Sequence, residues 1–200
     1  MLPIKITEIL ANFLAASVFS AITWLYIDAL QIRIEIKSVF RALGFLLLTI
    51  TFALNLLGIF VQTPSQTFTF WIQSTSLWLM YVSFIIDSHA KLQILSILAI
   101  VCLFLLKSHA LLSLQAFLIA ISVLQISYST KHKDLIPLVT GFFFMTIAEL
   151  FFYLEKFKGY ENLDLAANLM YIFCAIAFFY WLWSYLVIRF NLKGPSQNSY

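Results

Sequence analysis

Six amide or acid side chains near one end of the long apolar stretches of this 200-residue sequence are the residues best suited to bind a polar ligand. Polar groups are costly within a membrane, so they usually pair with one another or line a water-filled cavity. At a rise of about 1.5 Å per residue, all six fall within roughly 10 Å of one end of the helices that the sequence predicts. They therefore predict a ligand-binding pocket that opens to one side of a membrane. The six residues are Asn12, Asn55, Gln73, Gln115, Glu149 and Asn168.

Glu149 is the one charged member of this polar layer. Phenylalanine and leucine occupy positions 142–144 and 150–152 around it. A carboxyl group in such surroundings has to be paired, hydrogen bonded or protonated. The alternative is that amides near helix ends simply meet lipid headgroups and water, in which case no pocket forms. The partners that we expect for Glu149 are an amide of the layer, Lys107, Lys156 or Lys158.

Histidine and cysteine give no second site. His89, His109 and His132 fall at predicted loops or helix ends, whereas a haem ligand would sit on a helix within the membrane, and their spacing matches no known metal site. Cys102 and Cys174 lie in apolar stretches, where cysteine behaves as a small hydrophobe. We therefore predict no catalytic residues, no metal and no cofactor.

The composition requires a membrane around these residues. Hydrophobic residues make up 62% of the chain and charged residues 10%, with a mean hydropathy of +0.96. A water-soluble domain of this composition would expose large apolar patches. A membrane-spanning helix needs about 20 apolar residues, which 200 residues can supply about seven times. We predict seven such helices, at 9–29, 40–61, 68–87, 92–106, 110–128, 135–154 and 166–190.

The predicted fold class is therefore an all-α polytopic integral membrane protein, with one transmembrane helical domain over residues 1–200 and a short polar tail at 191–200. The division between 92–106 and 110–128 has an alternative, a single helix over 92–128. That helix would place Lys107 near the middle of the bilayer, at a cost of about 2.5 to 3.5 kcal/mol. Two helices are the better interpretation.

Basic residues set the orientation. Cytoplasmic loops of membrane proteins carry an excess of lysine and arginine. Eight basic residues fall on one side of the predicted bundle and four on the other, so we predict the N-terminus outside and the C-terminus in the cytoplasm of a bacterial or archaeal cell membrane. The scattered charges form no stripe for nucleic acid. The eight are Arg33, Lys37, Arg41, Lys91, Lys131, Lys133, Arg189 and Lys193; the four are Lys5, Lys107, Lys156 and Lys158.

Residues 31–37 alternate isoleucine with charge, a period of two that is typical of extended chain. They predict a connector at the headgroups or, alternatively, a sheet edge for a partner strand. The last helix is the richest in aromatic residues. Phe173, Ile176, Tyr180 and Trp183 align on it at helical spacing and predict a contact with another membrane subunit or a second copy of the chain. The alternative is that this stripe faces the protein's own bundle.

Two functions remain open. The helix count and orientation resemble the seven-helix sensor regions attached to bacterial signalling enzymes, which would imply a receptor-like role, and the 200 residues hold no output domain. We therefore expect a non-catalytic subunit or sensor-like binding module of a membrane assembly. The alternative is a small-solute transporter or channel. Transporters commonly use helices broken by glycine or proline, and such breaks are absent from this sequence.

The predicted orientation can be tested with single cysteines. Cysteines introduced at Ser65 and Gly159 should react from outside the cell with a membrane-impermeant thiol reagent, because both lie in predicted outer loops. A cysteine at Thr130, in a predicted cytoplasmic loop, should not react. Labelling at Thr130 alone would reverse the orientation.

Overall fold

The computed structural model describes residues 2–61, 66–87, 108–158 and 163–189, and these ranges contain helices and no strand. Five of the helices are long and apolar enough to cross a membrane, which makes this a multi-pass membrane protein. The elements are α1 (Leu2–Ile32), α2 (Ile36–Phe60), α3 (Gln66–Asp87), α5 (His109–Thr130), the 3₁₀ turn η1 (Lys133–Leu135), α6 (Ile136–Lys158) and α7 (Leu163–Arg189).

Six of the seven predicted helices are found, and the predicted helix at 92–106 lies outside the described residues. The helix ends differ from the predicted ones because backbone hydrogen bonding continues past the apolar run. α1, for instance, begins at Leu2 and not at residue 9. The extended connector predicted at 31–37 is wrong at both ends, since only residues 33–35 are non-helical. Glu35 in that connector pairs with Arg33 at 3.1 Å and with Lys37 at 3.4 Å.

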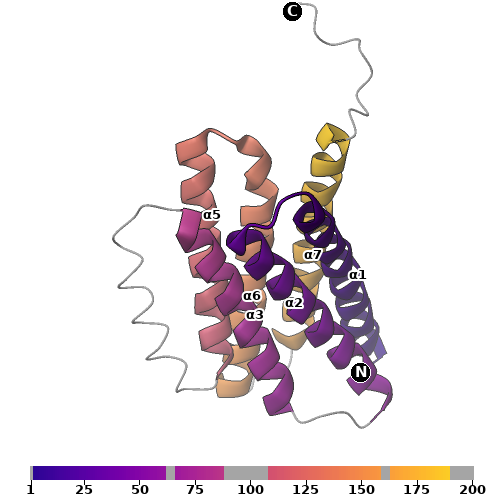
Figure 1. The fold of residues 1–200 in the computed structure, drawn as a ribbon. Coiled ribbons are helices and arrows are strands. Elements are labelled where there is room, and N and C mark those ends of the chain that lie inside the picture. Colours follow the sequence, from indigo (N-terminus) through magenta and orange to yellow (C-terminus); the bar gives the residue numbers. More distant parts are fainter. Residues whose placement is uncertain (1, 62–65, 88–107, 159–162, 190–200) are drawn as a thin grey trace, which may run out of the picture.

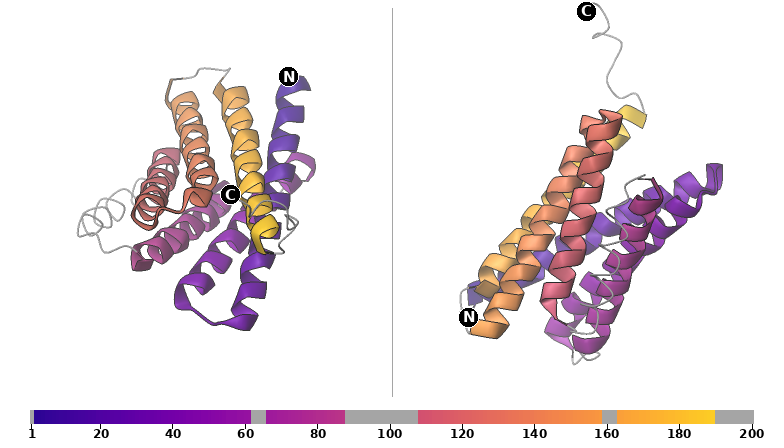
Figure 2. Two further views of the ribbon diagram at one scale, coloured as in Figure 1. Left: turned by 90° about the horizontal axis from the view of Figure 1, so that it is seen from above. Right: turned by 90° about the vertical axis from the view of Figure 1, so that its left-hand side faces the viewer.

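The described helices form a closed ring (Figures 1 and 2). Each helix packs against the next one described, and α7 returns to pack against α1. The starts of α3 and α5 lie at the same end of the bundle, because Ser74 near the start of α3 bonds Gln115 near the start of α5. α3 and α5 therefore run parallel, whereas α5 and α6 are joined as an antiparallel pair.

Phenylalanine side chains fill the middle of the ring. Phe178 of α7 contacts the rings of Phe19, Phe45 and Phe142, with centroid distances of 5.2, 6.0 and 5.0 Å. All four side chains are fully buried. Because the rings come from α1, α2, α6 and α7, this aromatic core joins opposite sides of the bundle and fills the centre between the described helices with apolar side chains.

α3 is more polar than its neighbours and is not among the five apolar spans. Its buried serines explain the difference, because they bond other helices. The Ser76 hydroxyl donates to the carbonyl oxygen of Gly44 on α2 at 2.7 Å. Ser83 accepts a 3.3 Å hydrogen bond from Arg41, whose guanidinium also lies over the Phe84 ring. The polarity that lowers the hydropathy of α3 thus serves helix packing.

Two glycines allow close helix contacts. A Cβ atom at Gly44 would lie 2.5 Å from Met80 Cγ and 3.2 Å from the Ser76 carbonyl oxygen, so α2 and α3 could not approach as they do. A Cβ at Gly141 of α6 would lie 2.7 Å from the Phe178 ring of α7. That ring is held by three other phenylalanines and has no space to move into.

Replacing Gly141 with alanine should therefore destabilise the protein by about 1 to 3 kcal/mol, because the methyl group overpacks the aromatic core. The matched control is Gly58→Ala on the exposed face of α2, which should be neutral or stabilise by up to about 1 kcal/mol. Unfolding in a mixed-detergent titration measures both. Equal stability of the two variants would contradict this packing.

Candidate binding site

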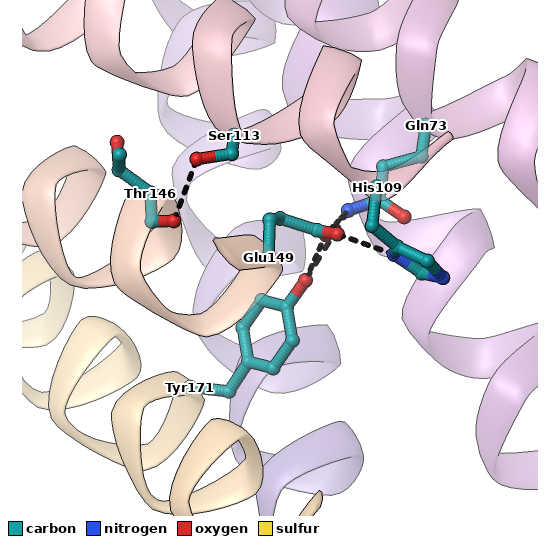
Figure 3. A network of polar contacts seen from close by, with 6 residues as sticks. All are labelled: Gln73, His109, Ser113, Thr146, Glu149 and Tyr171. Atoms are coloured by element: carbon teal, nitrogen blue, oxygen red, sulfur yellow. Dashed lines mark hydrogen bonds and ion pairs between the residues drawn. The ribbon is translucent and has the colours of Figure 1, made fainter. Parts of the chain in front are cut away.

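Glu149 is the centre of a polar network between four helices (Figure 3). Its Oε1 accepts hydrogen bonds from Tyr171 Oη of α7 and Gln73 Nε2 of α3. Its Oε2 lies 2.7 Å from Nδ1 of His109, the first residue of α5. Gln73 also donates to Tyr171 Oη at 3.3 Å. The carboxyl group, 1% exposed, thus has a donor from each of three neighbouring helices.

The ring of helices makes this convergence possible. α3, α5 and α7 begin at the end of the bundle where α6 finishes, so Gln73, His109 and Tyr171 reach Glu149 from the early part of each helix. Beside the network, the Ser113 hydroxyl of α5 donates to the Thr146 carbonyl oxygen of α6 at 2.9 Å. This bond fixes α5 against α6 one turn from the point where His109 meets Glu149.

A cavity of about 940 Å³ adjoins the network at this end of the bundle. A volume of this size is typical of small-molecule binding sites. His109 is the network member that faces it most openly, with a side chain 38% exposed. Charged residues surround the opening, and apolar side chains line the interior. The lining includes Lys5, Glu8 and Asn12 of α1, Phe52, Asn55 and Gly58 of α2, Phe70 and Gln73 of α3, His109 of α5, Glu149, Phe152, Glu155 and Lys156 of α6, and Asp164, Asn168 and Tyr171 of α7.

Five of the six predicted ligand-binding residues line this cavity: Asn12, Asn55, Gln73, Glu149 and Asn168. Gln115 is not in the lining and instead exchanges hydrogen bonds with Ser74. Among the six, the described hydrogen bonds join Gln73 with Glu149. Asn12 and Asn168 bond their own helices one turn back, at Glu8 and Asp164. A role for these residues in ligand binding stays a prediction.

The partners of Glu149 were partly predictable. An amide partner is found in Gln73, whereas Lys156 lines the cavity without pairing with Glu149. The predicted partners Lys107 and Lys158 have side chains outside the described part of the chain. His109 and Tyr171 do not follow from the sequence analysis. The available signal was their position on the side of the polar layer, because His109 directly precedes the predicted helix 110–128 and Tyr171 lies in the second turn of the predicted helix 166–190.

The inner end of the cavity is aromatic. Phe52 lines it and contacts both Tyr171, at 5.1 Å, and Phe19, at 5.5 Å between ring centroids. Phe19 belongs to the aromatic core. Phe52 therefore connects the lining of the cavity with the packed centre of the bundle.

In the described ranges, no three histidine, cysteine, aspartate or glutamate side chains are grouped so that they could hold a metal ion. Glu149 orients His109, and the remaining edge of that imidazole is available to a molecule in the cavity. The geometry supports binding and orientation of a polar group.

The predicted contact stripe lies on a different surface. Phe173, Ile176, Tyr180 and Trp183 are all exposed on the outside of α7, with exposed fractions between 46% and 61%. The stripe therefore faces away from the described bundle, although Phe173 also touches Phe144 of α6. Its use as a partner contact stays a prediction.

Comparison with protein-family models, curated proteins and solved structures gives no significant match to this chain. The function is therefore inferred from the geometry of the site.

Replacing Glu149 with leucine should cost about 3 to 5 kcal/mol of stability, because the buried donors Gln73 and Tyr171 and the partly exposed His109 lose their acceptor. Glu149→Gln should cost less, about 1 to 3 kcal/mol, since one oxygen still accepts from Tyr171 and Gln73. The control is Glu155→Gln, less than two turns further along α6 and only partly buried, which should change stability by less than about 0.5 kcal/mol. Mixed-detergent unfolding measures all three. Wild-type stability of Glu149→Leu would show that the network is not formed.

Proposed function

We propose that this protein is a non-catalytic binding module of a membrane assembly, and that it takes a small ligand into the cavity beside Glu149. The network of Glu149, His109, Tyr171 and Gln73 carries this proposal. A buried carboxyl group is costly in an apolar bundle, and this one is held by donors from three helices at the edge of a cavity. Ligand contacts with His109 would therefore act on several helices at once.

The proposal includes seven membrane helices, with the cavity opening to the outside. The parallel course of α3 and α5 supports this number. Both helices begin at the cavity end of the bundle, so one further span between them would bring the chain back to that end and make the total seven. The basic residues support the orientation. The cavity lies at the end with fewer lysines and arginines.

A signal from the ligand would need a partner chain. The exposed face of Phe173, Ile176, Tyr180 and Trp183 supports a contact with another subunit, since aromatic side chains offer large packing area between helices in lipid. α7 also carries Tyr171, two residues before Phe173 of this face. One helix therefore links the cavity to the proposed contact surface.

Native mass spectrometry of the gently extracted protein tests this proposal. The wild type should retain a small molecule or a partner chain. Asn55→Trp should lose the small molecule, because the indole fills the cavity without removing any member of the network. The matched control is Leu57→Trp, on an exposed face of α2 outside the lining, which should retain it.

The competing function is small-solute transport. The aromatic core of Phe19, Phe45, Phe142 and Phe178 argues against it, since these buried rings close the centre of the bundle. A monomer that retains neither ligand nor partner, yet moves a solute when reconstituted alone in liposomes, would overturn the binding module and establish a transporter.

A further inference from the structure

Two buried asparagines give the cavity free hydrogen-bond acceptors. Asn12 and Asn168 are 6% and 3% exposed and line the cavity. Asn12 Nδ2 donates to the Glu8 carbonyl oxygen at 2.9 Å, and Asn168 Nδ2 donates to the Asp164 carbonyl and carboxylate oxygens at 3.0 and 3.1 Å. Carbonyl oxygens need donors, so these bonds fix the amide orientation. In the described part of the structure, the two Oδ1 atoms accept no hydrogen bond.

His109 also borders the cavity with a partly exposed ring. Its Nδ1 lies 2.7 Å from Oε2 of Glu149. Among the described contacts Nε2 has no partner. This nitrogen accepts a hydrogen bond when the ring is neutral and donates one when the ring is charged.

The charges at the opening have the same bias. Glu8, Glu155 and Asp164 line the cavity together with Glu149, against two exposed lysines, Lys5 and Lys156. Asp164 is close enough to act electrostatically on both Glu8 and Glu155. The three carboxylates therefore form one negative region, drawn from α1, α6 and α7, that would attract a cation.

We propose that the cavity binds an organic ammonium ion with an apolar body. This inference rests on the proposed binding function and names the class of ligand. The ammonium hydrogens would donate to the free oxygens of Asn12 and Asn168 and to the carboxylates at the opening. The apolar body would pack against Phe52, Phe70 and Phe152, whose faces also attract cations.

An inorganic cation fits less well. Hard metal ions take several oxygen ligands at short distance, and no cluster of three potential metal-ligating side chains occurs in the described ranges. A cavity of about 940 Å³ is also far larger than a single ion requires. The size and the aromatic lining favour an organic molecule.

Three probes of one shape test this proposal: 2-phenylethylamine, 2-phenylethanol and phenylacetate. They have a similar apolar body and differ in a cationic, neutral or anionic end. Binding to the purified protein would be measured from the rise of the thermal unfolding midpoint with concentration. The amine should bind at least about tenfold more tightly than either other probe, because its charged donors meet unpaired acceptors.

Removing the three charges at the opening tests where the preference arises. The combined variant Glu8→Gln, Glu155→Gln and Asp164→Asn should weaken amine binding by about tenfold and leave 2-phenylethanol unchanged. The control Glu35→Gln, in the connector between α1 and α2, should leave amine binding unchanged. Asn55→Trp should abolish it, which shows that the amine occupies the cavity and not the detergent.

The outcomes separate the two proposals. Tighter binding of 2-phenylethanol or phenylacetate, lost in Asn55→Trp, would overturn the ammonium preference and leave the binding function standing. Equal stabilisation by sodium chloride and by the amine hydrochloride would assign the site to an inorganic cation and also overturn it. If none of the probes binds, and native mass spectrometry shows no retained molecule, both proposals are wrong.

Discussion

The buried carboxyl group of Glu149 is the constraint on which this structure depends. An isolated carboxyl group inside an apolar bundle is too costly to keep, so its surroundings must supply donors. Three helices provide them, through Gln73, His109 and Tyr171, and each must begin at the same end of the bundle to do so. The network therefore fixes the relative positions of α3, α5, α6 and α7, and the cavity lies beside it as a consequence.

Helix contacts away from Glu149 use different interactions. The centre of the ring is held by phenylalanine packing, and the α2–α3 contact by a glycine, a serine hydroxyl and a carbonyl oxygen. Contacts within lipid gain little from hydrophobic burial, so close packing and hydrogen bonds must supply the specificity. Polar residues gather at one end and aromatic residues fill the middle. This division gives the bundle a polar cavity at one end and an aromatic interior.

Much of the fold could be predicted from the sequence, because a spanning helix shows directly as an apolar stretch. The polar layer was also visible, since Gln73 and Glu149 stand out among phenylalanines and leucines. His109 and Tyr171 could not be assigned in the same way. Histidine at a helix start and tyrosine in an aromatic helix have common explanations at headgroups and in packing, and only the closing of α7 onto α1 and α6 brings Tyr171 to Glu149. Gln115 was predicted to line the pocket because its depth matches the polar layer. It instead bonds Ser74 on α3 and does not line the cavity.

A double-mutant cycle between Glu149→Gln and Tyr171→Phe tests most directly whether this network holds the bundle together. The free energy of unfolding would be measured for the wild type, both single variants and the double variant. Residues that share a buried hydrogen bond should show a coupling energy of about 1 to 3 kcal/mol. A coupling energy below about 0.5 kcal/mol would mean that the two side chains act independently, which contradicts the network.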